Sequence, residues 1–323
     1  QFGAVLVMLS SRQFGVGGCS TLLMGVVQMK LFRKCLLPSK TKLLAAAAAA
    51  ASTSAFSLPP FVDMVVLMDE STSMTGEQRW MAATIPRLDT GLNDRGVAPN
   101  RYGLVGFGAS VVVGPLDVRS FRVGGGQFGT AADYAAASSG LLNSGSYEDG
   151  YAAIALANTY TLRDTAARNY ILVSDEERHS SHVASAAYNY TDTLNNLLST
   201  DTLLNVVVNA SFKCGDNSPA LGIVGTTGYK ADGNGGFLSC PGASFTSGYR
   251  TTGDDYVRLA LATGGGAWDL NVLRSGGDNA TSFTIAFIDG KVAEITAIPE
   301  PTTAALIAAG LGVVGWAARR RAV

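Results

Sequence analysis

The sequence predicts an α/β protein with a doubly wound, mostly parallel central sheet flanked by helices. Residues 62–68 are an apolar, β-favouring run, interrupted only by Asp63, which is typical of a strand buried on both faces. This run ends in a polar loop, and an amphipathic helical pattern follows at 76–92. A second apolar run, 170–173, also ends in an acidic loop. Loops of this kind lie at the carboxyl edge of a parallel sheet, where α/β proteins bind ligands.

The remaining elements are expected in order up to residue 296. Strands are expected at 101–109, 203–208 and 267–270, and residues 110–116 are a candidate partner strand. Helices are expected at 130–142, 184–198, 255–262 and 283–295, and another is expected to begin near Gly150. Residues 211–252 are rich in Gly, Ser and Thr and exceed a usual connection, so we expect a surface insertion that shapes ligand contact, with a candidate short strand at 221–224.

Charge is unevenly distributed along the 323 residues. Residues 58–298 contain 24 Asp and Glu against 15 Lys and Arg, a net charge of −9, and no acidic residue precedes residue 58. An acidic domain argues against nucleic-acid binding and fits the binding of cations. The sequence contains neither a phosphate-binding loop nor a Gly-x-Ser-x-Gly motif. We therefore expect a binding protein rather than an enzyme.

The amino-terminal part has the layout of a secretory signal peptide. Residues 1–28 are interpreted as a non-native or mispredicted leader, with Met29 as a candidate start. Residues 29–57 contain basic residues, then the apolar run 43–51, then small residues suited to cleavage. An Ala-rich helix inside the fold is the alternative. The exported domain is accordingly expected to span residues 58–297.

Two cysteines, Cys214 and Cys240, lie in the predicted exported part. An even pair in an oxidising compartment indicates one disulfide, which would close a loop of 25 intervening residues. Closing such a loop is expected to stabilise the fold by about 3 kcal/mol. Two free buried thiols are the alternative.

Oxygen-bearing side chains follow both buried strands. Asp69, Ser71 and Ser73 form an Asp-x-Ser-x-Ser sequence, and Asp175 follows the second strand. Small oxygen donors of this kind suit a hard divalent cation such as Mg²⁺. Capping of the next helix is the simpler interpretation of such a loop. The acidic pair Glu148 and Asp149, at a helix start, is likewise favoured by the helix dipole alone.

Together these stretches resemble the von Willebrand factor A (VWA) domain, a Rossmann-like fold whose metal-ion-dependent adhesion site begins with Asp-x-Ser-x-Ser after the first strand. Glu148-Asp-Gly-Tyr-Ala-Ala-Ile154 resembles the integrin β-subunit variant, which uses Glu where most VWA domains use Thr. The resemblance implies these metal ligands: Asp69, Ser71, Ser73, Glu148 and Asp175, with Asp149 as the alternative to Glu148. It implies Mg²⁺, or else Mn²⁺ or Ca²⁺.

The resemblance also implies adhesion to an extracellular protein or acidic polysaccharide whose carboxylate completes the metal coordination. A structural matrix protein whose metal only stabilises the loops is the alternative, followed by a hydrolytic enzyme. The adjacent regulatory metal site of integrin β subunits is not expected, because Gly76 and Glu77 stand where that site needs paired acids. His179 and His182 are a poor zinc signature and are expected to face solvent.

The carboxyl-terminal segment, 298–323, has the order of a sorting signal. Pro299, Glu300 and Pro301 precede an apolar run that is long enough for a short membrane helix, and the chain then has the basic cluster Arg319, Arg320 and Arg321. A plain membrane anchor is the simpler interpretation. The segment resembles the PEP-CTERM signal of Gram-negative bacteria, which implies processing by an exosortase-type peptidase. The mature protein is then expected to be secreted or on the outer cell surface, after transient anchoring in the inner membrane.

Overall fold

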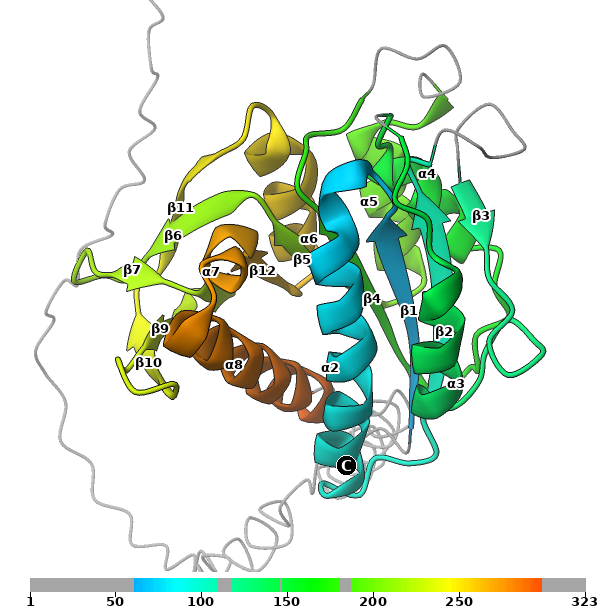
Figure 1. The fold of residues 1–323 in the computed structure, drawn as a ribbon, viewed down its shortest axis with the longest axis horizontal. Helices are drawn as coiled ribbons and strands as arrows, with labels where there is room; N and C mark the ends of the chain where they lie inside the picture. Colours follow the sequence, from blue (N-terminus) through cyan, green and yellow to red (C-terminus); the bar gives the residue numbers. More distant parts are fainter. Residues whose placement is uncertain (1–60, 110–117, 146, 180–186, 298–323) are drawn as a thin grey trace, which may run out of the picture. The chain divides into compact units, whose positions relative to one another are not determined.

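The computed structural model describes residues 61–109, 118–145, 147–179 and 187–297 (Figure 1). The predicted α/β class is confirmed. A nine-stranded sheet has the order β10-β9-β8-β12-β5-β4-β1-β2-β3, and neighbours from β12 to β2 pair in parallel. Its strands are β1 (Val62–Asp69), β2 (Arg101–Phe107), β3 (Val118–Ser120), β4 (Ala167–Ser174), β5 (Thr202–Val208), β8 (Gly222–Val224), β9 (Thr227–Ala231), β10 (Phe237–Pro241) and β12 (Gly266–Asp269).

Helices cover both faces of this sheet. They are α2 (Thr75–Asn93), α3 (Ala131–Ala137), α4 (Gly150–Ala157), α5 (Tyr190–Ser199), α6 (Arg258–Ala262), α7 (Leu270–Arg274) and α8 (Gly277–Thr296). Short 3₁₀ turns occur at η1 (Thr72–Met74) and η2 (Ser138–Gly140), and a π turn, η4 (Gly253–Val257), leads into α6. Most differences from the sequence prediction concern helix ends. The helix expected at 184–198 corresponds to α5, which begins at Tyr190, where the Asn189 side chain accepts the backbone N–H of Asp192 and caps it. Residues 184–186 of the expected helix lie outside the described residues.

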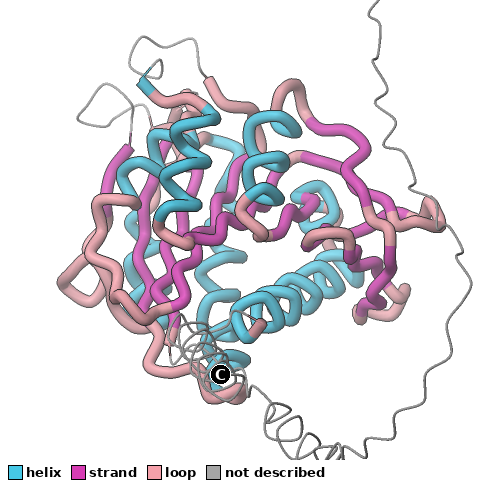
Figure 2. Tube along the Cα trace, turned by 180° about the vertical axis from the view of Figure 1, so that it is seen from behind, coloured by secondary structure: helices cyan, strands magenta, loops and turns pink. Residues whose placement is uncertain are grey.

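Apolar side chains alternate between the faces of β1 and divide the core in two. The even-numbered residues from Val62 to Met68 are fully buried in the cluster formed with α2, α3 and α8. Val65 and Leu67 are fully buried in the cluster formed with α4, α5 and α6. Figure 1 shows the first set of helices in front of the sheet, and Figure 2 shows the molecule from behind. A strand buried on both faces must be apolar throughout, which explains the continuous run in the sequence.

The segment 211–252 is more regular than the surface insertion that the sequence predicts. Its strands β8, β9 and β10 extend the main sheet beyond β12 through antiparallel pairs. Three further strands form a small separate sheet: β6 (Ala210–Lys213), β7 (Pro219–Ala220) and β11 (Ser244–Gly248). A disulfide joins Cys214, just after β6, to Cys240 in β10, with their Cα atoms 5.7 Å apart. It therefore links the small sheet to the extended edge of the main one.

Several predicted segments lie outside the described residues. They are the leader 1–28, the signal peptide 29–57, the candidate strand 110–116 and the sorting segment 298–323. Among the helices that the structure describes, none is both long and apolar enough to cross a membrane.

Candidate metal centre

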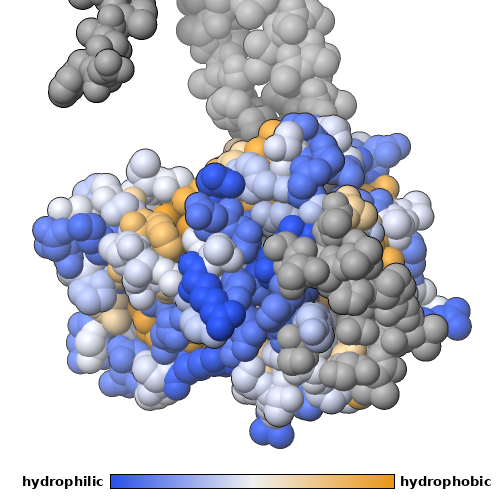
Figure 3. Space-filling view, turned by 90° about the horizontal axis from the view of Figure 1, so that it is seen from above, coloured by the Kyte–Doolittle hydropathy of each residue, from blue (hydrophilic) through white to orange (hydrophobic). Residues whose placement is uncertain are grey.

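The carboxyl ends of β1, β2 and β4 meet at one edge of the sheet. The parallel register places Asp69 beside Phe107 of β2, and Met68 beside Val173 of β4. Asp69 and Ser174 therefore end neighbouring strands, and the loops that follow them share the same edge. This edge is at the top of Figure 1, and Figure 3 shows hydrophilic side chains gathered across the middle of that face.

The Asp-x-Ser-x-Ser loop folds around the buried Asp69 carboxylate. One carboxylate oxygen, Oδ1, accepts the backbone N–H of Ser71 at 2.7 Å, and Oδ2 accepts the Ser174 hydroxyl at 2.8 Å. The hydroxyl oxygens of Ser71 and Ser73 lie 3.3 Å apart. Three of the predicted oxygen donors thus lie within one turn of chain, and Asp69 is tied directly to the end of β4.

Glu148 lies next to Asp69 across Gly108. A Cβ on Gly108 would lie 3.2 Å from Cγ of Glu148 and 3.3 Å from Oδ1 of Asp69, and Gly108 has a left-handed φ of +85°. Burial raises the pKa of Asp69 well above its usual range, and the Glu148 charge raises it further. Burial also raises the pKa of Glu148 to about 7, and the Glu176 charge contributes. The ionised form of each carboxyl group is therefore unfavourable unless a cation lies nearby.

Asp175 is held beside the same loop by an arginine from a distant part of the chain. The Nη2 atom of Arg274, at the end of α7, lies 2.9 Å from Asp175 Oδ2 and donates to the backbone oxygen of Ser73 at 3.2 Å. Arg274 Nε also donates to Glu77 at 2.7 Å. The other oxygen of Asp175, Oδ1, is buried and accepts no hydrogen bond from the described residues.

The alternative ligand, Asp149, is engaged elsewhere. Its Oδ1 atom accepts the backbone N–H groups of Tyr151 and Ala152 and so caps α4. Arg178 contacts both of its oxygens, with N–O distances of 2.7 and 3.1 Å. Helix capping and an ion pair therefore account for Asp149, whereas the Glu148 carboxylate lies against the ring of His179.

Glu70 supports the site and was missed in the sequence, where no pattern distinguishes it from a solvated loop residue. It is fully buried and forms an ion pair with Arg119 of β3. Its Oε1 atom accepts the backbone N–H of Leu142 at 2.6 Å, and its backbone oxygen accepts that of Ser144 at 2.9 Å. Glu70 thus fastens the Asp-x-Ser-x-Ser loop to the segment that leads to Glu148.

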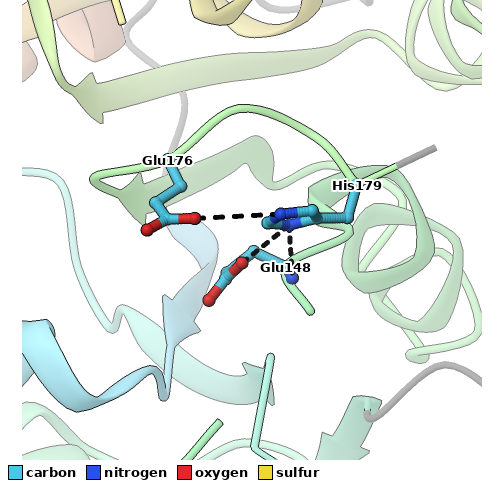
Figure 4. Close-up of side chains that lie close together, drawn as sticks. All are labelled: Glu148, Glu176 and His179. Atoms are coloured by element: carbon cyan, nitrogen blue, oxygen red, sulfur yellow. Dashed lines mark hydrogen bonds and ion pairs between the residues drawn. The ribbon is translucent and has the colours of Figure 1, made fainter. Parts of the chain in front are cut away.

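The expectation that His179 faces solvent is wrong. Its ring is half-buried, and its Nδ1 atom lies 2.7 Å from Oε2 of Glu148 (Figure 4). Glu176 lies on the other side of the ring, with Oε2 at 3.8 Å from Nε2. The second histidine, His182, lies outside the described residues.

Comparison with known proteins returns both resemblances found in the sequence. Residues 297–321 match the PEP-CTERM protein-sorting motif, so the chain carries the signal of an exported protein. The fold is similar to a von Willebrand factor type A protein from Catenulispora acidiphila, at 18% identity and a TM-score of 0.33, covering 46% of this chain and 33% of that one. It is also similar to the pilus adhesin SpaC from Lactobacillus rhamnosus GG, at 20% identity and a TM-score of 0.29, covering 36% of this chain and 16% of that one.

This chain thus spans a third or less of the length of either solved chain. No curated protein matches it. The chain is an α/β protein that carries a PEP-CTERM sorting motif, the signal of an exported protein.

Proposed function

We propose that this exported protein is a non-enzymatic adhesion module that binds its partner through a divalent cation at the carboxyl edge of its sheet. The proposed ligands are the following residues: Asp69, Ser71, Ser73, Glu148 and Asp175. The proposed cation is Mg²⁺, with Mn²⁺ or Ca²⁺ as alternatives, because every donor is an oxygen atom.

The observation that carries this proposal is the burial, at one edge of the sheet, of two carboxylates that have no Lys or Arg partner among the described residues. Asp69 and Glu148 are 0% and 1% exposed, and neither forms an ion pair with a Lys or Arg among the described residues. Burial of unpaired anions is unfavourable unless a cation or a proton neutralises them. A divalent ion would neutralise both carboxylates and would also provide a partner for the orphaned Asp175 Oδ1.

The partner that fits such a site is an extracellular protein or acidic polysaccharide with an accessible carboxylate. With Asp69 and Glu148 as the direct carboxylates, Asp175 acting through water and the serine hydroxyls neutral, the ion can attract a further anionic oxygen. The PEP-CTERM motif supports export, processing by an exosortase-type peptidase and a location at the outer surface or in the matrix of a Gram-negative bacterium. Before processing, the tail would hold the protein at the inner membrane.

Capture of matrix components tests this proposal. The full chain should retain components in Mg²⁺ and release them in EDTA, and Asp69→Asn should abolish retention. Asp164→Asn is the matched control, because Asp164 is fully exposed and lies before β4, at the opposite end of the strand from the site. Amidation of the partner's carboxylates should also abolish retention.

A structural role for the metal is the competing outcome. In that case Asp69→Asn would lower the melting temperature and remove its dependence on Mg²⁺, while retention of matrix components by the folded fraction would be unchanged. Retention that is equal in Mg²⁺ and EDTA would contradict metal-dependent adhesion directly.

A further inference from the structure

We propose that Glu148, Glu176 and His179 form a second cation site, which takes a borderline first-row ion such as Zn²⁺ rather than Mg²⁺. The inference rests on the proposed function in one respect, since Glu148 would contribute to both sites. One carboxylate oxygen from each Glu and one ring nitrogen of His179 lie within 4.8 Å of one another. Figure 4 shows both carboxylates directed at the ring from different sides.

The three side chains come from two loops that the fold holds together. Glu148 directly precedes the Asp149 cap of α4, whereas Glu176 and His179 follow β4. The backbone N–H of His179 donates to the backbone oxygen of Glu148 at 2.8 Å. The site is therefore positioned by a main-chain hydrogen bond and does not depend on flexible side chains alone.

The cluster places two carboxylates around one imidazole ring. Nδ1 of His179 accepts the backbone N–H of Glu148 at 3.1 Å and lies 2.7 Å from Oε2 of the same residue. Oε2 is buried and accepts no hydrogen bond from the described residues. Nε2 faces a second carboxylate, that of Glu176. A cation bound among the three side chains would supply the missing positive charge.

The nearby arginines Arg250 and Arg274 pair with other acids, so Glu148 and Glu176 remain available to a cation. Among the described residues, Arg250 pairs with Glu177 at 2.6 Å and Arg274 pairs with Asp175 at 2.9 Å. Among the described residues, Glu176 forms an ion-pair contact with His179. The Glu176 side chain is 40% exposed. Glu176 can thus reorient at low cost to close on an ion.

The donor set indicates the class of ion. Imidazole nitrogen and carboxylate oxygen are both ligand types that zinc uses in proteins, with donor–metal distances of about 2.0–2.2 Å. Mg²⁺ prefers oxygen ligands, so it should favour the neighbouring site of Asp69 and the serines. Zinc was not expected from the sequence, because His179 and His182 alone are a poor zinc signature. In the structure, His179 lies instead beside two glutamates.

Zinc binding in the presence of excess Mg²⁺ tests the proposal. The full chain, purified in detergent and stripped with EDTA, should bind one Zn²⁺ per molecule in equilibrium dialysis against Mg²⁺. X-ray absorption at the zinc edge should show one imidazole ligand. His179→Gln and Glu176→Gln should each weaken zinc binding at least tenfold, since even the loss of an outer-shell partner weakens metal sites by about 10–100-fold.

Glu177→Gln is the matched control and should bind zinc like the wild type, because Glu177 is the adjacent acid that Arg250 neutralises. Asp69→Asn should retain zinc although it loses the proposed Mg²⁺ site, so failure of either site is recognised separately. Circular dichroism and melting curves establish that each variant is folded. A wild type that binds no zinc above buffer level would overturn the inference, as would His179→Gln and Glu176→Gln variants with wild-type zinc affinity.

Discussion

Replacement of Glu148 by Gln should make the metal-free protein more stable at alkaline pH. The pKa of Glu148 is raised to about 7 from an ordinary value of 4.5, because the folded protein buries the carboxyl group. Between these pH values the folded state keeps a proton that the unfolded state has lost. The free energy of unfolding therefore falls as pH rises from about 4.5 to about 7, and it stays low above that range. A Gln at position 148 cannot ionise, so the variant should not lose stability in this way as pH rises.

The gap between the two pKa values corresponds to about 3 kcal/mol. In EDTA, wild type and Glu148→Gln should have similar unfolding free energies below pH 5, and the variant should be the more stable by about that amount at pH 8. Saturating Mg²⁺ should reverse the order at pH 8, because a ligand that binds only the folded state stabilises it and the amide is a poorer ligand than the carboxylate.

Urea unfolding at pH 5 and pH 8, with EDTA or Mg²⁺, measures all four values. Fluorescence can follow the transition, because Trp268 is fully buried and Trp80 packs against the core formed with α2 and α8. Asp164→Asn provides the exposed control. The reasoning would be refuted if wild type in EDTA were at least as stable as Glu148→Gln at pH 8. It would also be refuted if Mg²⁺ stabilised both proteins equally.

Three further substitutions test the scaffold of the site. Gly108→Ala should destabilise the fold by about 1–2 kcal/mol, because a side chain is strained at the left-handed φ of this residue. It should also weaken Mg²⁺ binding in a calorimetric titration. Unchanged Mg²⁺ affinity would contradict the close packing of Gly108 against Glu148 and Asp69. Arg274→Gln should lower stability in EDTA by about 1–3 kcal/mol, and Mg²⁺ should recover part of this loss if Asp175 helps to hold the ion. Joint replacement of Cys214 and Cys240 by Ser should reduce the free energy of urea unfolding by about 3 kcal/mol, and a loss below 1 kcal/mol would show that the insertion is held by its strands alone.

The central strands could be predicted because burial on both faces leaves a continuous apolar run. This holds for β1 and β4, and the helix α2 was equally clear from its spacing. Apart from β8, which matches the candidate strand at 221–224, the strands between residues 210 and 248 could not be predicted in the same way. They are two to five residues long, contain many Gly and Ser residues, and gain their order from pairing with distant strands and from the disulfide. Local sequence does not encode such pairing.

The positions of the candidate ligands were predictable where these residues lie in short motifs at strand ends. Asp69, Ser71, Ser73 and Asp175 follow β1 and β4 in sequence and therefore lie at one edge in space. Contacts between remote segments left no such signal. Arg274 reaches Ser73 from 201 positions away in the sequence, and Glu70 has its partners on β3 and on the segment that leads to Glu148.

The distribution of ion pairs at this edge leads us to expect a fixed order of binding at the proposed metal site. Asp175 and Glu177 each have an arginine partner, whereas the described residues give no Lys or Arg partner to Asp69, Glu148 or Glu176. An acidic partner that approaches the metal-free edge meets this unneutralised negative charge and is repelled. Once a divalent ion is bound, it neutralises two of these three negative charges, and its open coordination position can take an oxygen of the partner's carboxylate. A partner carboxylate should therefore bind only after the cation. In the absence of metal, raising the partner's concentration should not restore binding.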